Sequence, residues 1–417
     1  MSPHDLILFF LQVSLMLAAA VVFGQLVRKL GQPVVLGEII GGILLGPSFF
    51  GVLAPNLHAW LFPTAGITLT VRDTVIKLGM LFFLFVAGLE VDITHLRRRG
   101  WRIVWISVTG IVVPFSLGFG LVRFFPGVWG LQTNNTPIFA LFIGTALSIS
   151  ALPLIARILM DLDMIKEEIG MVVMAAATID DLVGWALFAV ILGNFVPGKL
   201  LDSFMVGPWT TPGLVLVFFI LFLTIGRWAA QRSLGWLQNR LTWPSSFIGV
   251  MIVLILAAAA VSELIGIHSI FGAFLVGVAF ARKSEKRDQA HEMVYQFVVS
   301  FFAPIYFVSI GLQVDFTTNF DLPLVLLVLV IACAGKIGGA TLGALMGKMP
   351  FKESLAVGFG MNARGMMEMI LASVAYEHKV IDQRVFIALI VMALVTSILS
   401  GPMMQRLLKI TKTRIQA

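Results

Sequence analysis

The sequence predicts an all-α membrane protein with thirteen transmembrane helices. Of its 417 residues, 59% are hydrophobic and 12% are charged, whereas soluble domains carry about 25% charged residues. Apolar runs of roughly twenty residues, the length that crosses ~30 Å of hydrocarbon, recur along the whole chain. Most Lys and Arg residues fall in every second loop between these runs, as cytoplasmic loops require. We therefore expect residues 1–417 to form a single integral membrane domain.

The expected helices follow the apolar runs in chain order. They cover residues 6–26, 34–52, 74–91, 103–122, 137–156, 168–193, 212–226, 246–265, 268–281, 292–312, 323–347, 353–376 and 385–405. The loop charges place the N-terminus outside and the C-terminus in the cytoplasm, which requires an odd number of helices. The basic stretches Arg97-Arg98-Arg99 and Arg282-Lys283 then face the cytoplasm.

A short internal similarity predicts an inverted repeat. Gly88-Leu89-Glu90-Val91-Asp92 closes the third expected helix, and Gly311-Leu312-Gln313-Val314-Asp315 closes the tenth. The segment from Gly41 to Gly46 also resembles the segment from Gly272 to Gly277, with the two ends aligned in that order. Each pair is seven helices apart, so its members cross the membrane in opposite directions. Six-helix inverted repeats are typical of secondary transporters with a site at the membrane midplane.

Asp180 and Asp181 are the strongest candidates for chemistry. They lie about a dozen residues into the sixth expected helix, ~18 Å along it, and charges within a membrane span are costly enough to require an explanation. Two neighbouring carboxylates in a low dielectric are not expected to be both ionised and empty, so they hold protons or a cation. The other interpretation is that both acids lock helices together through hydrogen bonds, but a pair of acids favours a functional site.

Lys336 lies near the middle of the eleventh expected helix, where it needs a counter-ion or must lose its proton. Either Asp180 or Asp181 can supply the counter-ion. The resulting ion pair either opens when a cation or proton binds or acts as a permanent bridge, and the sequence leaves both possibilities open.

The fifth and twelfth expected helices contain residues that interrupt helices. In the fifth, Pro153 leaves the carbonyl of Ile149 without its usual donor. Hard oxygen ligands suited to Na⁺ or K⁺ are then available from freed carbonyls and from the nearby hydroxyls of Thr145, Ser148 and Ser150. An ordinary proline kink, with those hydroxyls bonded back to the helix, is the alternative.

The twelfth helix carries a cluster of residues that form helices poorly, and it predicts a second interruption. The cluster comprises Gly358, Gly360, Asn362, Arg364, Gly365 and Glu368. Arg364 and Glu368 are four residues apart and can neutralise each other, which favours an architectural role. Glu38, near the start of the second helix, either lines an entrance or extends to the membrane interface.

Three motifs in a common order resemble the monovalent cation:proton antiporter-2 family of the sodium/proton exchanger superfamily. They are the stretch from Ala146 to Pro153 (ALSISALP), the pair Asp180-Asp181, and the stretch from Met361 to Glu368 (MNARGMME). The last is most similar to the plant cation/proton exchangers and their bacterial relatives. The resemblance runs from about residue 30 to residue 405.

The resemblance implies a sodium/proton-antiporter fold with two crossed discontinuous helices. It implies a dimer subdomain at about 6–91 and 246–312, a core subdomain at about 103–193 and 323–405, and a linker helix at about 212–226. Members form homodimers and work by an elevator-like movement of the core.

The resemblance also assigns roles to individual residues. Asp181 becomes the principal ion and proton carrier, Asp180 the partner of Lys336, and Ser150 a hydroxyl beside the carboxylates. The plant exchangers usually have Asn-Asp where this chain has two acids, so cation preference and stoichiometry stay open. Many relatives carry a cytoplasmic regulatory domain after the membrane region, but only about a dozen residues follow the last expected helix here. We expect no such domain.

The expected function is exchange of Na⁺ or K⁺ for H⁺ by alternating access in a bacterial inner membrane. We expect no cofactor, contact with lipid, a homodimer and no nucleic acid. A gated potassium efflux system of the same fold is the main alternative. An intramembrane enzyme is disfavoured because no HExxH or GxSxG pattern occurs. A purely structural subunit would leave three buried charges without a mobile partner.

Overall fold

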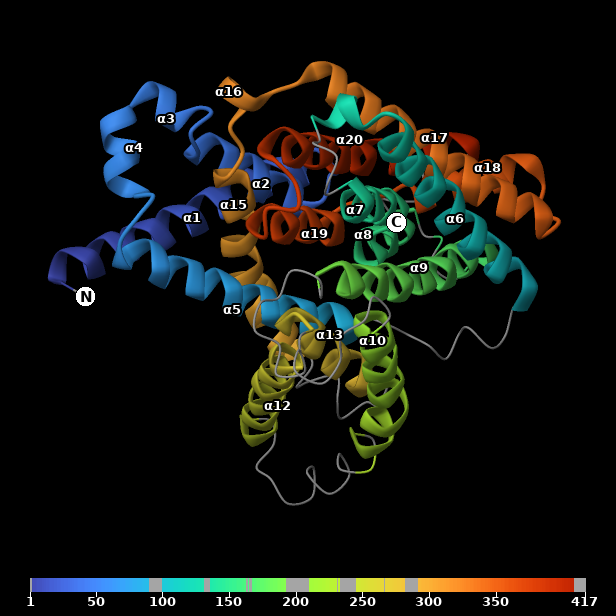
Figure 1. The fold of residues 1–417 in the computed structure, drawn as a ribbon, viewed down its shortest axis with the longest axis horizontal. Coiled ribbons are helices and arrows are strands. Elements are labelled where there is room, and N and C mark those ends of the chain that lie inside the picture. The colour runs from blue at the N-terminus through green and yellow to red at the C-terminus, as the bar shows by residue number, and fades with distance from the viewer. Residues whose placement is uncertain are drawn as a thin grey trace. The chain divides into compact units, whose positions relative to one another are not determined.

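The computed structural model describes residues 2–89, 100–130, 136–162, 164, 167–192, 210–230, 232, 245–265, 267–281 and 292–408. All regular elements in these ranges are helices, which confirms the all-α prediction (Figure 1). The chain divides into two compact units: unit 1 is Met1–Val91 with Leu192–Thr318, and unit 2 is Asp92–Ile191 with Asn319–Ala417. The basic stretches at 97–99 and 282–283, and residues 90–92 of the repeat, lie outside the described residues.

Unit 1 contains the first five helices and a later group from the middle of the chain. They are α1 (Pro3–Lys29), α2 (Val34–Leu45), α3 (Phe50–Leu53), α4 (Pro55–Leu61), α5 (Ile67–Leu89), α10 (Thr210–Leu221), the π-helical η4 (Phe222–Gly226), α12 (Ser245–Leu264), α13 (Ser269–Phe280), the π-helical η5 (Val298–Phe302), α15 (Ala303–Leu312) and α16 (Phe316–Asn319), which runs into unit 2. Helix α1 packs along α2, α2 along α15, and α5 along α13.

Two of these helix pairs approach so closely that only glycine fits at the crossing. A β-carbon on Gly42 of α2 would lie 2.9 Å from the Cα of Gly311 on α15 and would overlap the carbonyl of Val308. A β-carbon on Gly88 of α5 would lie 3.0 Å from the Cα of Gly277 on α13. Small residues let membrane helices gain close backbone contact where no hydrophobic effect drives association.

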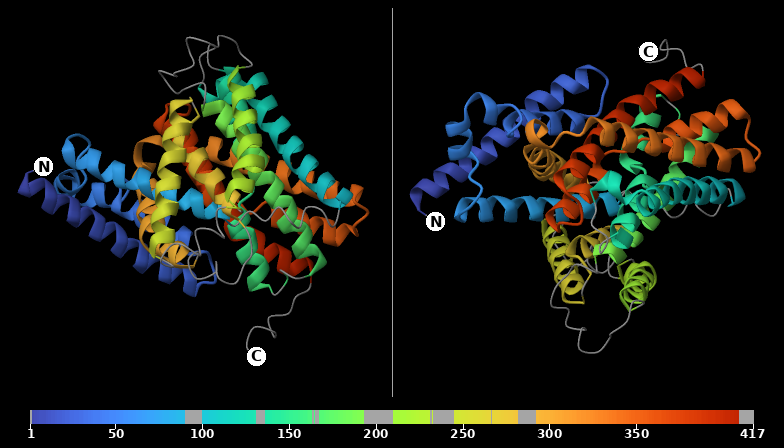
Figure 2. Two further views of the ribbon diagram at one scale, coloured as in Figure 1. Left: turned by 90° about the horizontal axis from the view of Figure 1, so that it is seen from below. Right: turned by 45° about the horizontal axis from the view of Figure 1, so that its top comes forward.

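Unit 2 contains four helices of 25 residues and the two interrupted ones. It consists of α6 (Gly100–Phe124), the 3₁₀ turn η2 (Pro126–Trp129), α7 (Thr136–Ser148), α8 (Leu152–Asp161), α9 (Glu168–Leu192), α17 (Leu322–Met346), α18 (Phe351–Met361), α19 (Met366–Glu377) and α20 (Gln383–Leu407). Helix α6 packs along both α7 and α17, and α18 packs against α17 and α20, which also contact each other. Figure 2 shows the same arrangement from two further directions.

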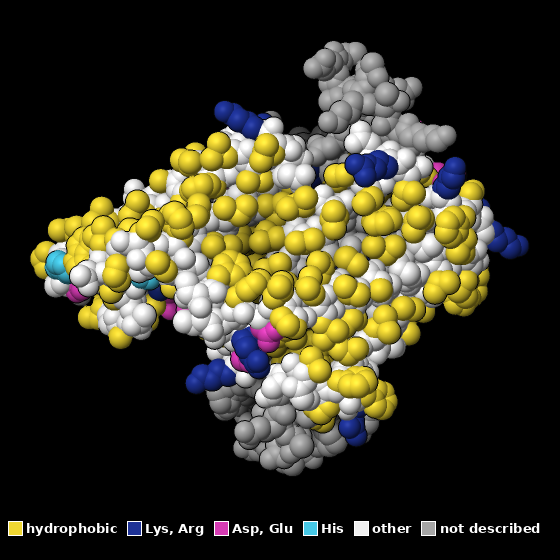
Figure 3. Space-filling view, turned by 90° about the horizontal axis from the view of Figure 1, so that it is seen from above, with side chains coloured by type: hydrophobic (Ala, Val, Ile, Leu, Met, Phe, Trp, Pro, Cys, Tyr) yellow, Lys and Arg dark blue, Asp and Glu magenta, His cyan; other side chains and the backbone are white. Residues whose placement is uncertain are grey.

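The surface of the described residues is that of a membrane protein. Hydrophobic side chains are spread over much of the face in Figure 3. Large hydrophobic residues of α1 and α17, such as Val21 and Val330, are exposed. Eight helices in the described ranges are long and apolar enough to cross a membrane, and three shorter apolar helices lie at Leu216–Ala230, Ile248–Leu264 and Ser269–Phe280. The integral membrane prediction is confirmed, and the count of thirteen crossings stays a prediction.

Candidate ion-binding site

The fifth expected helix is interrupted rather than simply kinked. Helix α7 ends at Ser148 and α8 begins at Leu152, with Pro153 in its first turn. The backbone of Ala151 is extended, with φ −100° and ψ 98°. Because proline cannot donate to a carbonyl in the preceding turn, it favours the start of a new helix at this point.

The three hydroxyls near this break have different environments. The Thr145 hydroxyl donates to the Leu141 carbonyl at 2.8 Å, and the Ser148 hydroxyl donates to the Thr145 carbonyl at 2.8 Å, so both bond back to their own helix. Only the Ser150 hydroxyl lies at the break itself. Its Oγ is 3.2 Å from Asp180 Oδ2 and 2.7 Å from the Met361 carbonyl.

The twelfth expected helix is also interrupted, and the two breaks lie against each other. Helix α18 ends at Met361 and α19 begins at Met366. The Ala151 amide donates to the carbonyl of Ala363 at 3.0 Å, in addition to the bond from Ser150 to Met361. The hydroxyl of Ser397 on α20 donates to the Arg364 carbonyl. Backbone groups that two interruptions leave unsatisfied are therefore partly satisfied by each other and by a neighbouring helix.

Asp180 and Lys336 form a buried ion pair beside these breaks. They are the thirteenth of the 25 residues of α9 and the fifteenth of the 25 residues of α17, and neither side chain is exposed to solvent. Lys336 Nζ lies 2.5 Å from Asp180 Oδ2. It also donates to the carbonyl of Gly110, at 3.1 Å, and to the carbonyl of Ser148.

Asp181 is buried as well, with 1% of its surface exposed. As the next residue on α9, it points about 100° away from Asp180 around the helix axis. The two acids are thus neighbours that face different surroundings, and Asp180 forms the ion pair with Lys336.

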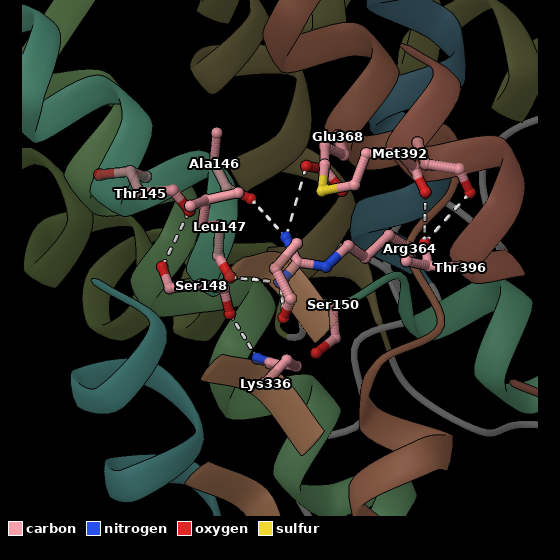
Figure 4. A network of polar contacts seen from close by, with 12 residues as sticks. Thr145, Ala146, Leu147, Ser148, Ser150, Lys336, Arg364, Glu368, Met392 and Thr396 are labelled. Carbon is pink, nitrogen blue, oxygen red and sulfur yellow. Dashed lines mark hydrogen bonds and ion pairs between the residues drawn. The ribbon is translucent and has the colours of Figure 1, made fainter. Parts of the chain in front are cut away.

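Arg364 neutralises the C-terminal end of α7 (Figure 4). Its guanidinium donates to the carbonyl of Ala146 at 3.0 Å and to that of Leu147, both in the last turn of the helix. It also lies 3.3 Å from the carbonyl of Ala332 and 3.4 Å from Glu368 Oε1. The last carbonyls of a helix lack intrahelical donors and carry partial negative charge. Arg364 and Lys336 together supply cationic donors to three such carbonyls.

The remaining predicted residues are placed as follows. Asn362 lies between the two halves of the twelfth helix, with 1% of its surface exposed, and its Nδ2 lies 3.6 Å from the Sγ of Cys333 on α17. Glu38 lies in unit 1, apart from this cluster of contacts. It is 6% exposed, so its side chain is buried and does not extend to an interface, which was one of the two alternatives that the sequence left open.

Sequence reasoning did not identify the backbone carbonyls that bind Lys336 and Arg364, nor the contact of Cys333. The carbonyls carry no residue-type signal. Cys333 had one available signal, because it precedes Lys336 by three residues and so shares its helix face. In the described ranges, no group of three or more His, Cys, Asp or Glu side chains is placed to hold a metal ion.

Comparisons with known proteins agree over most of the chain. The family profile described as "Sodium/hydrogen exchanger, transmembrane" matches residues 15–410. Cation/H⁺ antiporter 18 of Arabidopsis thaliana is 35% identical over 406 residues, which are 96% of this chain and 49% of that protein. The Na⁺/H⁺ antiporter NhaS4 of Synechocystis is 30% identical over 415 residues, covering 98% of each. The chain thus spans about half the length of the plant relatives that it matches.

A solved structure has the same fold. The sodium proton antiporter MjNhaP1 of Methanocaldococcus jannaschii superimposes with a TM-score of 0.68 at 18% sequence identity, covering 97% of this chain and 99% of that one. At this identity the likeness establishes the fold alone. The profile match over nearly the whole chain, together with the NhaS4 relative, shows that this chain belongs to the transmembrane sodium/hydrogen exchanger family.

Proposed function

We propose that this protein exchanges a monovalent cation, Na⁺ or K⁺, for protons by alternating access at Asp180 and Asp181. The observation that carries the proposal is the buried Asp180–Lys336 ion pair, which lies where the two helix breaks meet, with Asp181 next to it in sequence. Relatives named Na⁺/H⁺ antiporter in Synechocystis and K⁺/H⁺ antiporter 1 in Saccharomyces cerevisiae support exchange and leave the cation open.

Charge balance explains why such a site exchanges one ligand for another. Asp180 and Lys336 carry opposite charges, so ionisation of Asp181 adds one negative charge to the group in a low dielectric. Either a proton or one monovalent cation neutralises that charge, and both use the same carboxylate oxygens. Binding is therefore mutually exclusive, and a barrier prevents the empty, charged site from crossing between the two sides.

For this function we propose thirteen transmembrane helices that form a six-helix inverted repeat, with two discontinuous helices that cross each other. The glycine crossings of unit 1 support the repeat. Gly88 and Gly311 begin the two matching Gly-Leu-X-Val-Asp motifs, and their contacts are Gly277 and Gly42 respectively. If the two halves of the repeat are exchanged, the contact between Gly88 and Gly277 corresponds to the contact between Gly311 and Gly42. This correspondence pairs Gly42 with Gly277, a register four residues from the one that the sequence suggested.

Each unit then has its own role. We assign unit 1, with a linker at 212–226, to a homodimer scaffold, and unit 2 to a core that moves in an elevator-like manner. The membrane is a bacterial inner membrane, with the N-terminus outside and the C-terminus in the cytoplasm. No cofactor is needed, because the cation and proton are substrates.

Transport by purified protein in liposomes tests the proposal. Proton flux is followed with an entrapped pH-sensitive dye while Na⁺, K⁺ or Li⁺ is added outside, with and without a membrane potential. We expect cation-driven proton flux in the native protein, none in Asp181→Asn, and native flux in Glu292→Gln, which removes an exposed carboxylate of unit 1. Full activity of Asp181→Asn would refute the assignment. Cation flux without proton countertransport would instead indicate gated efflux.

A further inference from the structure

Asn362 carries a buried oxygen atom that none of the contacts above uses. Its amide nitrogen lies near Cys333, but Oδ1 has no hydrogen-bond partner among the described residues. Asp180 Oδ1 is likewise buried and without a hydrogen-bond partner in the described part of the chain, because Lys336 and Ser150 both bind Oδ2. Unpaired buried oxygens are unfavourable, so one oxygen at a helix interruption and one on the neighbouring helix are available to bind a cation.

A closed ring of contacts links the two residues that carry these oxygens. Starting at Asp180, the ring passes through the ion pair to Lys336 and then to Cys333, one turn away on the same face of α17. Cys333 contacts Asn362. The carbonyl of the residue before Asn362 accepts from the Ser150 hydroxyl, which returns the ring to Asp180. Each link is a single contact or one helical turn, so the ring is only a few residues wide.

We propose that Asn362 Oδ1 is a ligand of the transported cation and acts together with Asp180 Oδ1 and Asp181. This inference rests on the proposed exchange function and adds a residue that determines its specificity. Amide and carboxylate oxygens are hard ligands suited to alkali cations. The amide contributes an oxygen without a charge, so the site with a monovalent cation stays neutral, whereas a divalent cation would leave an uncompensated positive charge in the interior.

The amide also has different effects on the binding of the two substrates, the cation and the proton. A proton needs only a carboxylate, because a neutral amide oxygen binds it far more weakly than an acid does. Loss of Asn362 Oδ1 therefore weakens cation binding without removing the proton-binding group. A residue that merely holds the chain break in place would weaken both equally.

Equilibrium binding and transport together test the assignment. Purified full-length protein is melted in detergent with increasing K⁺, Na⁺ or Li⁺ against choline, and its KM for the cation is measured in liposomes. We expect Asn362→Leu, which is similar in size but lacks the oxygen, to raise the apparent dissociation constant and KM at least about tenfold, equivalent to ~1.4 kcal/mol. Proton binding, followed by the pH dependence of melting without alkali cation, stays as in the native protein.

Two further variants separate a ligand from a structural contact. Gln12→Leu removes a buried amide of unit 1 whose Oε1 also has no partner among the described residues, and we expect unchanged cation affinity. Cys333→Ala removes only the weak contact to the amide nitrogen of Asn362, so we expect less than about a twofold change, since sulfur is a weak acceptor.

The outcomes are distinct. Native cation affinity in Asn362→Leu overturns the inference. A change in cation affinity in Cys333→Ala as large as that in Asn362→Leu also overturns it, because the amide would then only hold the interrupted helix in place. If Asn362→Leu does not fold, Asn362→Ala carries the same expectation. Absence of any alkali-cation effect on the native protein refutes the exchange function itself, and with it this inference.

Discussion

Replacing Lys336 by methionine would leave Asp180 as an uncompensated carboxylate inside unit 2. Methionine preserves the length of the side chain, so packing against α6 and α7 changes little. What is lost is the ion pair with Asp180 and the donors to the carbonyls of Ser148 and Gly110. Breaking a buried pair by removing one partner typically costs about 3–5 kcal/mol. We expect Lys336→Met to lower the free energy of unfolding by an amount in this range.

A double-mutant cycle isolates the contribution of the pair. Asp180→Asn removes the charge of the other partner, and Asp180→Asn with Lys336→Met removes both. Because the double variant removes both members of the pair, neither of them is left as an unpaired buried charge, and we expect it to be more stable than Lys336→Met alone. A coupling energy of about 0.5–3 kcal/mol between the two positions is typical of residues in direct contact.

The assay is reversible unfolding of the purified variants in detergent, monitored by tryptophan fluorescence. Trp185, one turn after Asp181 on α9 and 1% exposed, reports on the packing of this region. Additive costs for the two substitutions would refute the reasoning, since two residues that stabilise each other's charge cannot be energetically independent. Ser150→Ala serves as a control for the hydrogen bond that remains on Asp180.

Two further predictions follow from contacts described above. Thr145→Val should leave the KM for the cation within about twofold in liposome transport, because the hydroxyl bonds back to Leu141 in its own helix. A large rise in KM would show that Thr145 is a ligand after all. Gly277→Val should prevent close packing of α13 on α5, because its side chain would overlap the carbonyl of Phe85. We expect loss of folded protein in detergent by size-exclusion chromatography, and native yield would contradict the crossing.

The interruptions of the helices were predictable from local chemistry. Pro153 and the glycine-rich run around Asn362 each remove helical stability at a defined place, and the structure interrupts the chain at Ile149–Ala151 and Asn362–Gly365. The predicted start of α5 was wrong. The helix begins at Ile67, seven residues before the expected start, because the charges of its first turns suggested a loop.

Contacts between distant segments could not be predicted in this way. Sequence spacing made Arg364 and Glu368 a helical ion pair, yet Arg364 precedes α19 and its main partners are carbonyls more than 200 residues earlier in the chain. Depth along the helix also left open which of the two adjacent acids pairs with Lys336, and only the family resemblance assigned Asp180, the partner in the structure. The direction of each depends on the rotation of α9, which local sequence does not determine.

All contacts of the candidate site, from Ser150 and Asp180 to Lys336 and Arg364, fall within unit 2. A rigid displacement of that unit therefore carries the whole coordination shell along without breaking a single bond in it. Ions would then be bound by the same set of atoms on either side of the membrane. The intrinsic affinity would be the same for loading and for release. The concentrations of the two competing ions, together with the membrane potential where exchange moves net charge, would set the direction of transport.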